Sequence, residues 1–447
     1  MVKKNTKVAT FSTRRLAFIG VITILIPVLV SLSLGLTGHH SMLGSFHAFL
    51  TFRTGGDSWG PMEKALQYLA SHPDGHLYEK LFVIDKIKFQ YPPTSLLFHK
   101  IFYFMGLSPT LTLLTAINWI AICINALAVV AIGLTLGNQA DMRGNKKVLI
   151  SLLLLSTVFV SYPAMGAFNI GQIQVWINTL FAITCLTWIK QRKAWAGCLI
   201  GVICLIKPQF SLFLLWGLLR REKQFVIGGL LTAGAGLLAS IMLFGLHNHI
   251  EYIEVLRKLS KTGECFWPNQ SMNGILNRWV DLSCGVPWQA HAYPQYNPIV
   301  YFGTLLSSAA LILGALFFAG GQQKGSLLDF QIASLSFTMA SPIAWVHHYG
   351  ILPAIYIAAF YAISRMADNQ AAKQCMVFLA ISYLLTSNYV MLADDLNGSV
   401  FNIGDSYIYF GALILLGTLY YLQRQNPAHS ATQKSMENLN VQELYSS

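Results

Sequence analysis

The chain has 447 residues, of which 54% are hydrophobic and 11% charged, and its formal net charge is +12. So much apolar sequence excludes a soluble globular protein and indicates one that crosses a membrane many times. The positive charge does not point to nucleic acid, because Lys and Arg lie in short clusters between apolar runs, where they set membrane topology.

The first apolar run, 16–36, is long enough to cross a bilayer and has no convincing cleavage site, so we expect an uncleaved first span rather than a signal peptide. Basic residues precede it: Lys3, Lys4, Lys7, Arg14 and Arg15. This flank predicts a cytoplasmic N-terminus and a following loop on the outer face.

Further apolar runs bring the expected number of spans to about twelve: 109–135, 148–163, 172–189, 195–206, 209–219, 224–245, 299–318, 327–341, 349–364, 374–393 and 405–422. The expected inner turns are short and basic: Arg143, Lys146 and Lys147; Lys190, Arg192 and Lys193; Arg220, Arg221 and Lys223. Both chain ends are therefore predicted to be cytoplasmic. The runs 195–206 and 209–219 are short, so they form a broken or re-entrant pair or cross a locally thinned bilayer.

These features predict an all-α polytopic membrane protein with one integral membrane domain, 1–422, and a polar, disordered cytoplasmic tail, 423–447. Two large loops, about 37–93 and 246–298, are expected on the outer side, which favours an active or binding face there. Cys265 and Cys284 lie in the second loop, where an oxidising compartment would permit a disulfide; two free thiols are the alternative.

An acid follows the first span at Asp57, in the flexible context of Gly55-Gly56. Its carboxylate could accept a proton as general base. The alternative is a solvated loop acid, which position alone favours, since Glu63, Asp74, Glu79 and Asp85 lie in the same loop. The loop ends in Tyr91-Pro92-Pro93, which predicts a rigid extended exit because a residue before proline avoids the helical region.

Polar side chains near span ends are costly and therefore functional candidates. Asn169 and Gln172 lie at a helix start, where amides either cap the helix or bind sugar hydroxyls. Lys207, before Pro208, places a cation at a helix break. It either binds an anionic headgroup or extends along the lipid surface.

The second outer loop presents Asn269 and, in an expected helix at 275–280, Arg278, which could clamp a phosphate or pair with a loop acid. Trp345, His347 and His348 close a span at 341–349, where they hold a phosphate or sugar or belong to the interfacial aromatic belt. Too few ligands accompany them for a metal site, so we expect no metal and no cofactor.

Taken in order, these segments resemble glycosyltransferase family 87, multi-spanning enzymes of the GT-C superfamily that use polyprenyl-phosphate sugars and are often mannosyltransferases. The resemblance covers about 50–365 and rests on Asp57, Tyr91-Pro92-Pro93, Asn169-Ile170-Gly171-Gln172, Ala196-Gly197 with Lys207-Pro208, Asn269-Gln270-Ser271 with Arg278, and 341–348. Ser58-Trp59-Gly60-Pro61 departs from the paired tyrosines that many relatives have at that place.

The resemblance implies a GT-C-like bundle in the plasma (inner) membrane and an inverting sugar transfer, most often of mannose, on the outer face. The donor would be a polyprenyl-phosphate sugar and the acceptor a lipid or glycan. Asp57 would be the base, and the leaving phosphate would be stabilised by Lys207, Arg278, His347 and His348. The implied substrate-binding residues are Tyr91, Asn169, Gln172, Asn269 and Trp345.

Two alternatives remain at this point. One is an O-antigen polymerase or ligase, which would also use a large outer loop. The other is a lipid or solute transporter, which would suit the broken helices around Lys207. The donor sugar, the acceptor and the oligomeric state stay open.

Overall fold

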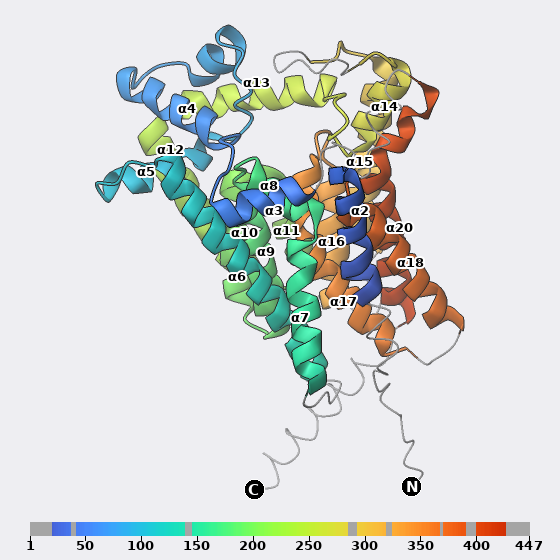
Figure 1. Cartoon of the computed structure of the whole chain (residues 1–447). Coiled ribbons are helices and arrows are strands. Elements are labelled where there is room, and N and C mark those ends of the chain that lie inside the picture. The colour runs from blue at the N-terminus through green and yellow to red at the C-terminus, as the bar shows by residue number, and fades with distance from the viewer. Residues whose placement is uncertain are drawn as a thin grey trace, which may run out of the picture.

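A computed structural model describes residues 20–36, 42–138, 145–284, 293–318, 324–366, 370–389 and 399–425. Within these ranges the chain forms helices and no β-strand (Figure 1). An antiparallel bridge between Asn269 and Trp345 is the one β-type pairing there. The prediction of an all-α polytopic membrane protein is confirmed. The basic N-terminal residues, Arg143 and the predicted tail from 426 onward lie outside the described residues.

Within the described residues, each predicted span contains a helix or a pair of helices. Five helical segments are long and apolar enough to cross a membrane alone: Leu111–Gly137 within α6 (Leu111–Asn138), Lys223–Phe244 (α12), Pro298–Phe318 (α15 with η5), Val346–Ser364 (η6 with α17) and Phe401–Gln425 (η7 with α20). Five apolar helical segments are shorter: Val21–Leu36 (η1 with α2), Gln174–Ile189 (α9), Lys193–Ile206 (α10), Pro208–Leu219 (η4 with α11) and Leu327–Met339 (α16). The helix α18 (Gln370–Ser387) has 18 residues. The predicted span 148–163 is a pair, α7 (Asn145–Phe159) and α8 (Tyr162–Asn169), bent by 52°.

The predicted break at Lys207-Pro208 is confirmed. The helix α10 ends at Ile206, and Lys207 is extended, with φ −130° and ψ 94°. Pro208 then begins η4, where its missing N–H costs nothing and its fixed φ suits the first helical turn. Lys207 is therefore held between two helices at a defined point.

The helix α10 is supported by very close packing against α12. A Cβ atom added at Gly197 would lie 2.0 Å from the carbonyl oxygen of Phe225. Only glycine permits this approach of two backbones. The result is a rigid helix pair that carries Lys207 at its end.

The two predicted outer loops fold largely into helices. The first forms α3 (Met42–Thr51), α4 (Trp59–Ser71) and η2 (Glu79–Ile84), followed by η3 (Pro93–Leu96) and α5 (Leu97–Phe104). The second forms α13 (Leu246–Thr262) and α14 (Met272–Val280). The helices α4, α13 and α14 gather at one end of the bundle, which we call the loop end (Figure 1). There a disulfide joins Cys265 and Cys284, the first of the two alternatives.

Lys193 begins α10 at the other end of the bundle, the basic end. The 14 residues of α10 separate it from Lys207 by about 20 Å. At the basic end Arg220 forms a buried ion pair with Asp329 of α16, with 2.6 Å between Nε and Oδ2. Arg220 also donates to the carbonyls of Leu316 and Ala315. These contacts lock α11, η5 and α16 together, away from the loop end.

Candidate active site

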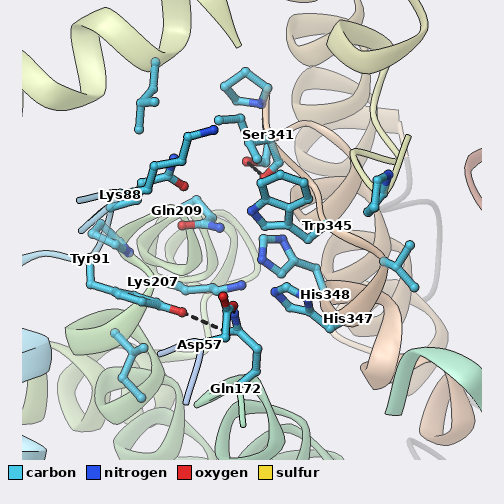
Figure 2. A pocket seen from close by; sticks show the side chains of 18 of the residues that line it. Asp57, Lys88, Tyr91, Gln172, Lys207, Gln209, Ser341, Trp345, His347 and His348 are labelled. Carbon is cyan, nitrogen blue, oxygen red and sulfur yellow. Dashed lines mark hydrogen bonds between the residues drawn. The ribbon is translucent and has the colours of Figure 1, made fainter. Parts of the chain in front are cut away.

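A cavity of about 950 Å³ lies at the loop end, between α13, the end of α10 and the start of η6. Seven of the ten predicted site residues line it: Asp57, Tyr91, Gln172, Lys207, Trp345, His347 and His348. Figure 2 shows Asp57, Lys207 and the two histidines directed toward one another in one part of the cavity. The fold thus brings together side chains that are far apart in the sequence.

Asp57 is held by the turn that joins α8 to α9. The N–H of Gly55 donates to the carbonyl of Asn169 over 2.8 Å, and the N–H of Asp57 donates to the carbonyl of Ile170 over 3.0 Å. Gly171 has a φ of +72°, and an added Cβ there would lie 1.8 Å from the carbonyl oxygen of Gly55. Glycine is therefore required at 171 both for its φ and for the close approach. The segment expected to be flexible is clamped.

A hydrogen-bond network surrounds the Asp57 carboxylate. The side-chain amide of Gln172 donates to Asp57 Oδ2. The carbonyl oxygen of the same amide accepts from the hydroxyls of Ser58 and Tyr91, each over 2.8 Å. Ser58 Oγ in turn accepts from the N–H of Ile173 over 3.0 Å. Oδ1 of Asp57 takes part in no hydrogen bond within the described part of the chain, and it is available to a substrate.

Asp57 is open to the cavity but surrounded by protein. Burial raises the pKa of its carboxyl above the ordinary value of 3.8, and the hydrogen bond from Gln172 acts in the opposite direction. Burial also raises the pKa of the Tyr91 phenol, which therefore stays a neutral donor. A carboxylate with a raised pKa is a better proton acceptor. Asp57 thus has the access and the basicity of a general base.

Lys207, His347 and His348 form the cationic and hydrogen-bonding part of the wall. Lys207 is 8% exposed, and its Nζ has no hydrogen-bond partner among the residues that the structure describes. The rings of His347 and His348 lie 4.8 Å apart, and Trp345 stacks on His347 at 6.5 Å. Because a buried amine without a partner is costly, this arrangement is suited to an anionic ligand.

Three predicted site residues do not line the cavity. Arg278 is buried in the second loop, where it donates to the carbonyls of Cys265, Phe266 and Asn269 and to Ser406 Oγ. Its guanidinium is occupied in holding this loop together. The side chain of Asn269 bonds the carbonyls of Glu264 and Pro342 and the N–H of Ala344, and Asn169 contributes its backbone carbonyl to the clamp on Gly55. Their predicted roles toward phosphate or sugar therefore have no support in the geometry.

The sequence interpretation missed Ser58 and Lys88. Ser58 is fully buried beside Asp57, and its place directly after Asp57 was the signal. Lys88 lines the cavity and forms a 2.7 Å ion pair with Glu264. No group of three or more His, Cys, Asp or Glu side chains is placed to hold a metal in the described ranges.

The sequence model of glycosyltransferase family 87 matches residues 89–342, more than half of the chain. The chain belongs to this family. It is therefore a membrane glycosyltransferase, as the resemblance implied, and the transporter alternative falls away. The matched range contains Tyr91, Gln172 and Lys207, whereas Asp57 precedes it and the two histidines follow it.

A relative from Mycolicibacterium smegmatis is similar to this family 87 chain over 325 residues, with 24% identity and 70% of each chain covered. It is named a polyprenol-phosphate-mannose-dependent alpha-(1-2)-phosphatidylinositol mannoside mannosyltransferase. This chain is thus similar in sequence to an enzyme whose name states that it depends on a lipid-phosphate sugar.

Proposed function

We propose that this chain transfers a mannosyl group from polyprenyl-phosphate-mannose to a hydroxyl of a lipid or glycan, with inversion at the anomeric carbon. The observation that carries the proposal is the charge arrangement of the cavity. Among the described residues that line it, Asp57 is the single acid, and it faces the part of the wall with Lys207, His347 and His348. A base and an anion site on one cavity are what an in-line displacement requires.

The reaction needs one proton transfer and one displacement. Asp57 takes the proton of the acceptor hydroxyl while the oxygen forms a bond to the anomeric carbon. The bond from that carbon to the phosphate oxygen breaks on the opposite side, and its electron pair leaves with polyprenyl phosphate. Lys207 and the histidine N–H groups stabilise the charge that develops on the phosphate. The products are the glycoside, polyprenyl phosphate and protonated Asp57.

The structure supports Asp57 over the other acids of its loop. Glu63 accepts hydrogen bonds from Gln67 and Tyr103, and Asp85 pairs with Lys80 at 2.8 Å. Neither acid lines the cavity. The base is therefore assigned to Asp57.

We assign the cavity to the non-cytoplasmic face. The basic turns that precede Lys193 and Lys223 lie at the opposite end of the bundle, as the positive-inside rule requires of cytoplasmic turns. Gln423, near the end of α20, accepts from Ser326 beside Asp329 at that same basic end, which supports a cytoplasmic C-terminus. The disulfide at the loop end suits an oxidising compartment. The name of the relative supports mannose as the sugar.

The test is transfer by purified protein in detergent, with polyprenyl-phosphate-mannose as donor and membrane lipids or glycans as acceptors. We expect transfer by the wild type and its loss in Asp57→Asn, which keeps the shape of the side chain and removes its basicity. The same assay with other lipid-phosphate sugars would identify a different donor. Wild-type transfer that persists in Asp57→Asn would overturn the assignment of the base.

A further inference from the structure

Gln172 was expected to bind substrate, but both its amide nitrogen and its amide oxygen bond protein groups. We propose that Gln172 is a positioning residue for the base: its carboxamide, bonded through its oxygen to Ser58 and Tyr91, donates to one oxygen of Asp57 and leaves the other oxygen to the acceptor hydroxyl. This inference rests on the proposed function, because it concerns the base of that reaction.

The orientation of the amide follows from its contact with the Asp57 carboxylate. An ionised carboxylate can only accept hydrogen bonds, so the amide atom that faces Asp57 Oδ2 must be the NH₂ group of Gln172. The amide oxygen then faces Ser58 and Tyr91, whose hydroxyl oxygens lie 2.8 Å from it and from each other. Each of these hydroxyls carries one hydrogen and can donate it to the amide oxygen.

The alternative orientation would set the amide oxygen against the Asp57 carboxylate, with two acceptors facing each other. Gln172 is 5% exposed, so water cannot readily replace the lost bond. The carboxylate thus selects the orientation that serves the base, and Ser58 and Tyr91 bond the amide oxygen on the other side.

A fixed donor on Oδ2 has two consequences for the chemistry. It fixes the plane of the carboxylate, so that Oδ1 is presented to the cavity in one direction. It also stabilises the ionised form and thereby opposes the effect of burial on the pKa of Asp57. Without Gln172 the base would take up its proton at higher pH and be less often ready to act.

Other titratable groups also face Asp57. Tyr91 precedes η3, Lys207 follows α10, and His347 and His348 lie on η6, and all four line the same cavity. The Nζ of Lys207 has no hydrogen-bond partner, Asp57 included, among the described residues. A substitution at Gln172 leaves all four groups in place, so a change in the titration of Asp57 would report the loss of the amide donor.

The experiment measures the pH dependence of transfer by Gln172→Met, which keeps the length of the side chain and removes the donor. Activity needs the ionised base, so it is present above the pKa of Asp57 and lost below it. A hydrogen bond to a charged group corresponds to a shift of about one to two pH units. We expect the acid limb of kcat/KM to move up by about this amount, with activity partly recovered at higher pH. Gln172→Glu, which adds a second carboxylate, should move it further.

The matched control is Gln209→Met, the same chemical change at another glutamine of the cavity wall. Its acid limb should stay at the wild-type pH, whatever its rate. A role of Gln172 in substrate binding alone would raise KM and leave the limb unmoved. An unmoved acid limb in Gln172→Met would overturn the proposal.

A second readout does not depend on catalysis. Infrared difference titration of the substrate-free protein, with Asp57→Asn as the reference, follows the carboxyl C=O band of Asp57. Its midpoint should be higher in Gln172→Met than in the wild type, and equal midpoints would refute the inference. If the wild type transferred no sugar, the proposed function would fail, while this titration would still decide whether Gln172 acts on Asp57.

Discussion

Replacing Lys207 by methionine should raise stability and lower activity at once. Lys207 is 8% exposed, and its Nζ is without a hydrogen-bond partner among the described residues. A buried donor left in this state costs about 1–3 kcal/mol. Methionine has a similar length and adapts to irregular space. The substrate-free Lys207→Met protein should therefore gain up to about that much stability.

Transfer should change in the opposite direction. If Lys207 donates to the leaving phosphate, the lost hydrogen bond to a charged group is worth about 1.5–3 kcal/mol. At about 1.4 kcal/mol for each factor of ten, kcat/KM should fall roughly 10- to 150-fold. If Lys207 had only a structural role, its replacement by methionine would not raise stability and lower the rate of transfer together.

The assay pairs initial rates with thermal unfolding in detergent, each with and without polyprenyl phosphate. The ligand should raise the unfolding midpoint of the wild type, because it binds only the folded state, and it should raise that of Lys207→Met much less. A variant that is less stable than the wild type, or that transfers sugar at the wild-type rate, would refute the reasoning.

Lys88→Met provides the contrast. Lys88 lines the same cavity, but it pairs with the buried Glu264 at 2.7 Å. Removing one partner of a buried pair leaves an uncompensated charge and costs roughly 3 kcal/mol. The same substitution should therefore destabilise the protein at 88 and stabilise it at 207.

Two further predictions test the framework around the cavity. The Gly171→Ala variant should be less stable than the wild type by about 3 kcal/mol or more and should lose transfer, because Gly171 has a positive φ and an added Cβ would clash with Gly55. The control is Gly44→Ala on α3, where an added Cβ meets nothing within 4 Å; this variant should unfold at or above the wild-type temperature. Equal unfolding temperatures of the two variants would contradict this account. The Arg278→Leu substitution should lower the free energy of unfolding by about 3 kcal/mol, since it leaves carbonyls unpaired. The folded fraction of this variant should transfer sugar within a few-fold of the wild-type rate. A stable Arg278→Leu protein that transfers no sugar would instead support the predicted role of Arg278 in binding phosphate.

Much of the fold was predictable because the bilayer imposes long apolar runs. The expected span 109–135 begins two residues before α6 and ends within it, and 224–245 is α12 shifted by one residue at each end. Among the helices of the loops, α14 was expected, as the helix at 275–280, whereas α3, α4, η2 and α13 were not predicted, since the overall composition of the loops is polar. In α4 the buried residues Trp59, Met62 and Leu66 follow helical spacing, and this period was the signal to look for.

The sequence predicted which residues line the site better than it predicted what each of them does. Lys207 and the two histidines were identified because cations near span ends are costly and conspicuous, and they do line the cavity. The role of Arg278 depends on carbonyls and on Ser406, more than a hundred residues away, and charge alone cannot distinguish such partners from a phosphate. The pairing of Gln172 with Asp57 likewise depends on a tertiary contact that no local pattern encodes.

The strand-like contact between Asn269 and Trp345 has a consequence for protein engineering. Gln270 donates its N–H to the carbonyl of Ala344, and Val346 donates to that of Pro268, both within 3.0 Å. Two segments more than seventy residues apart thus behave as a single part that ends in the paired histidines. A chimera that takes 341–348 from a relative but keeps its own 268–270 would contain only one of the two paired segments from that relative. We therefore expect donor preference to be transferred between relatives only when both segments are exchanged together.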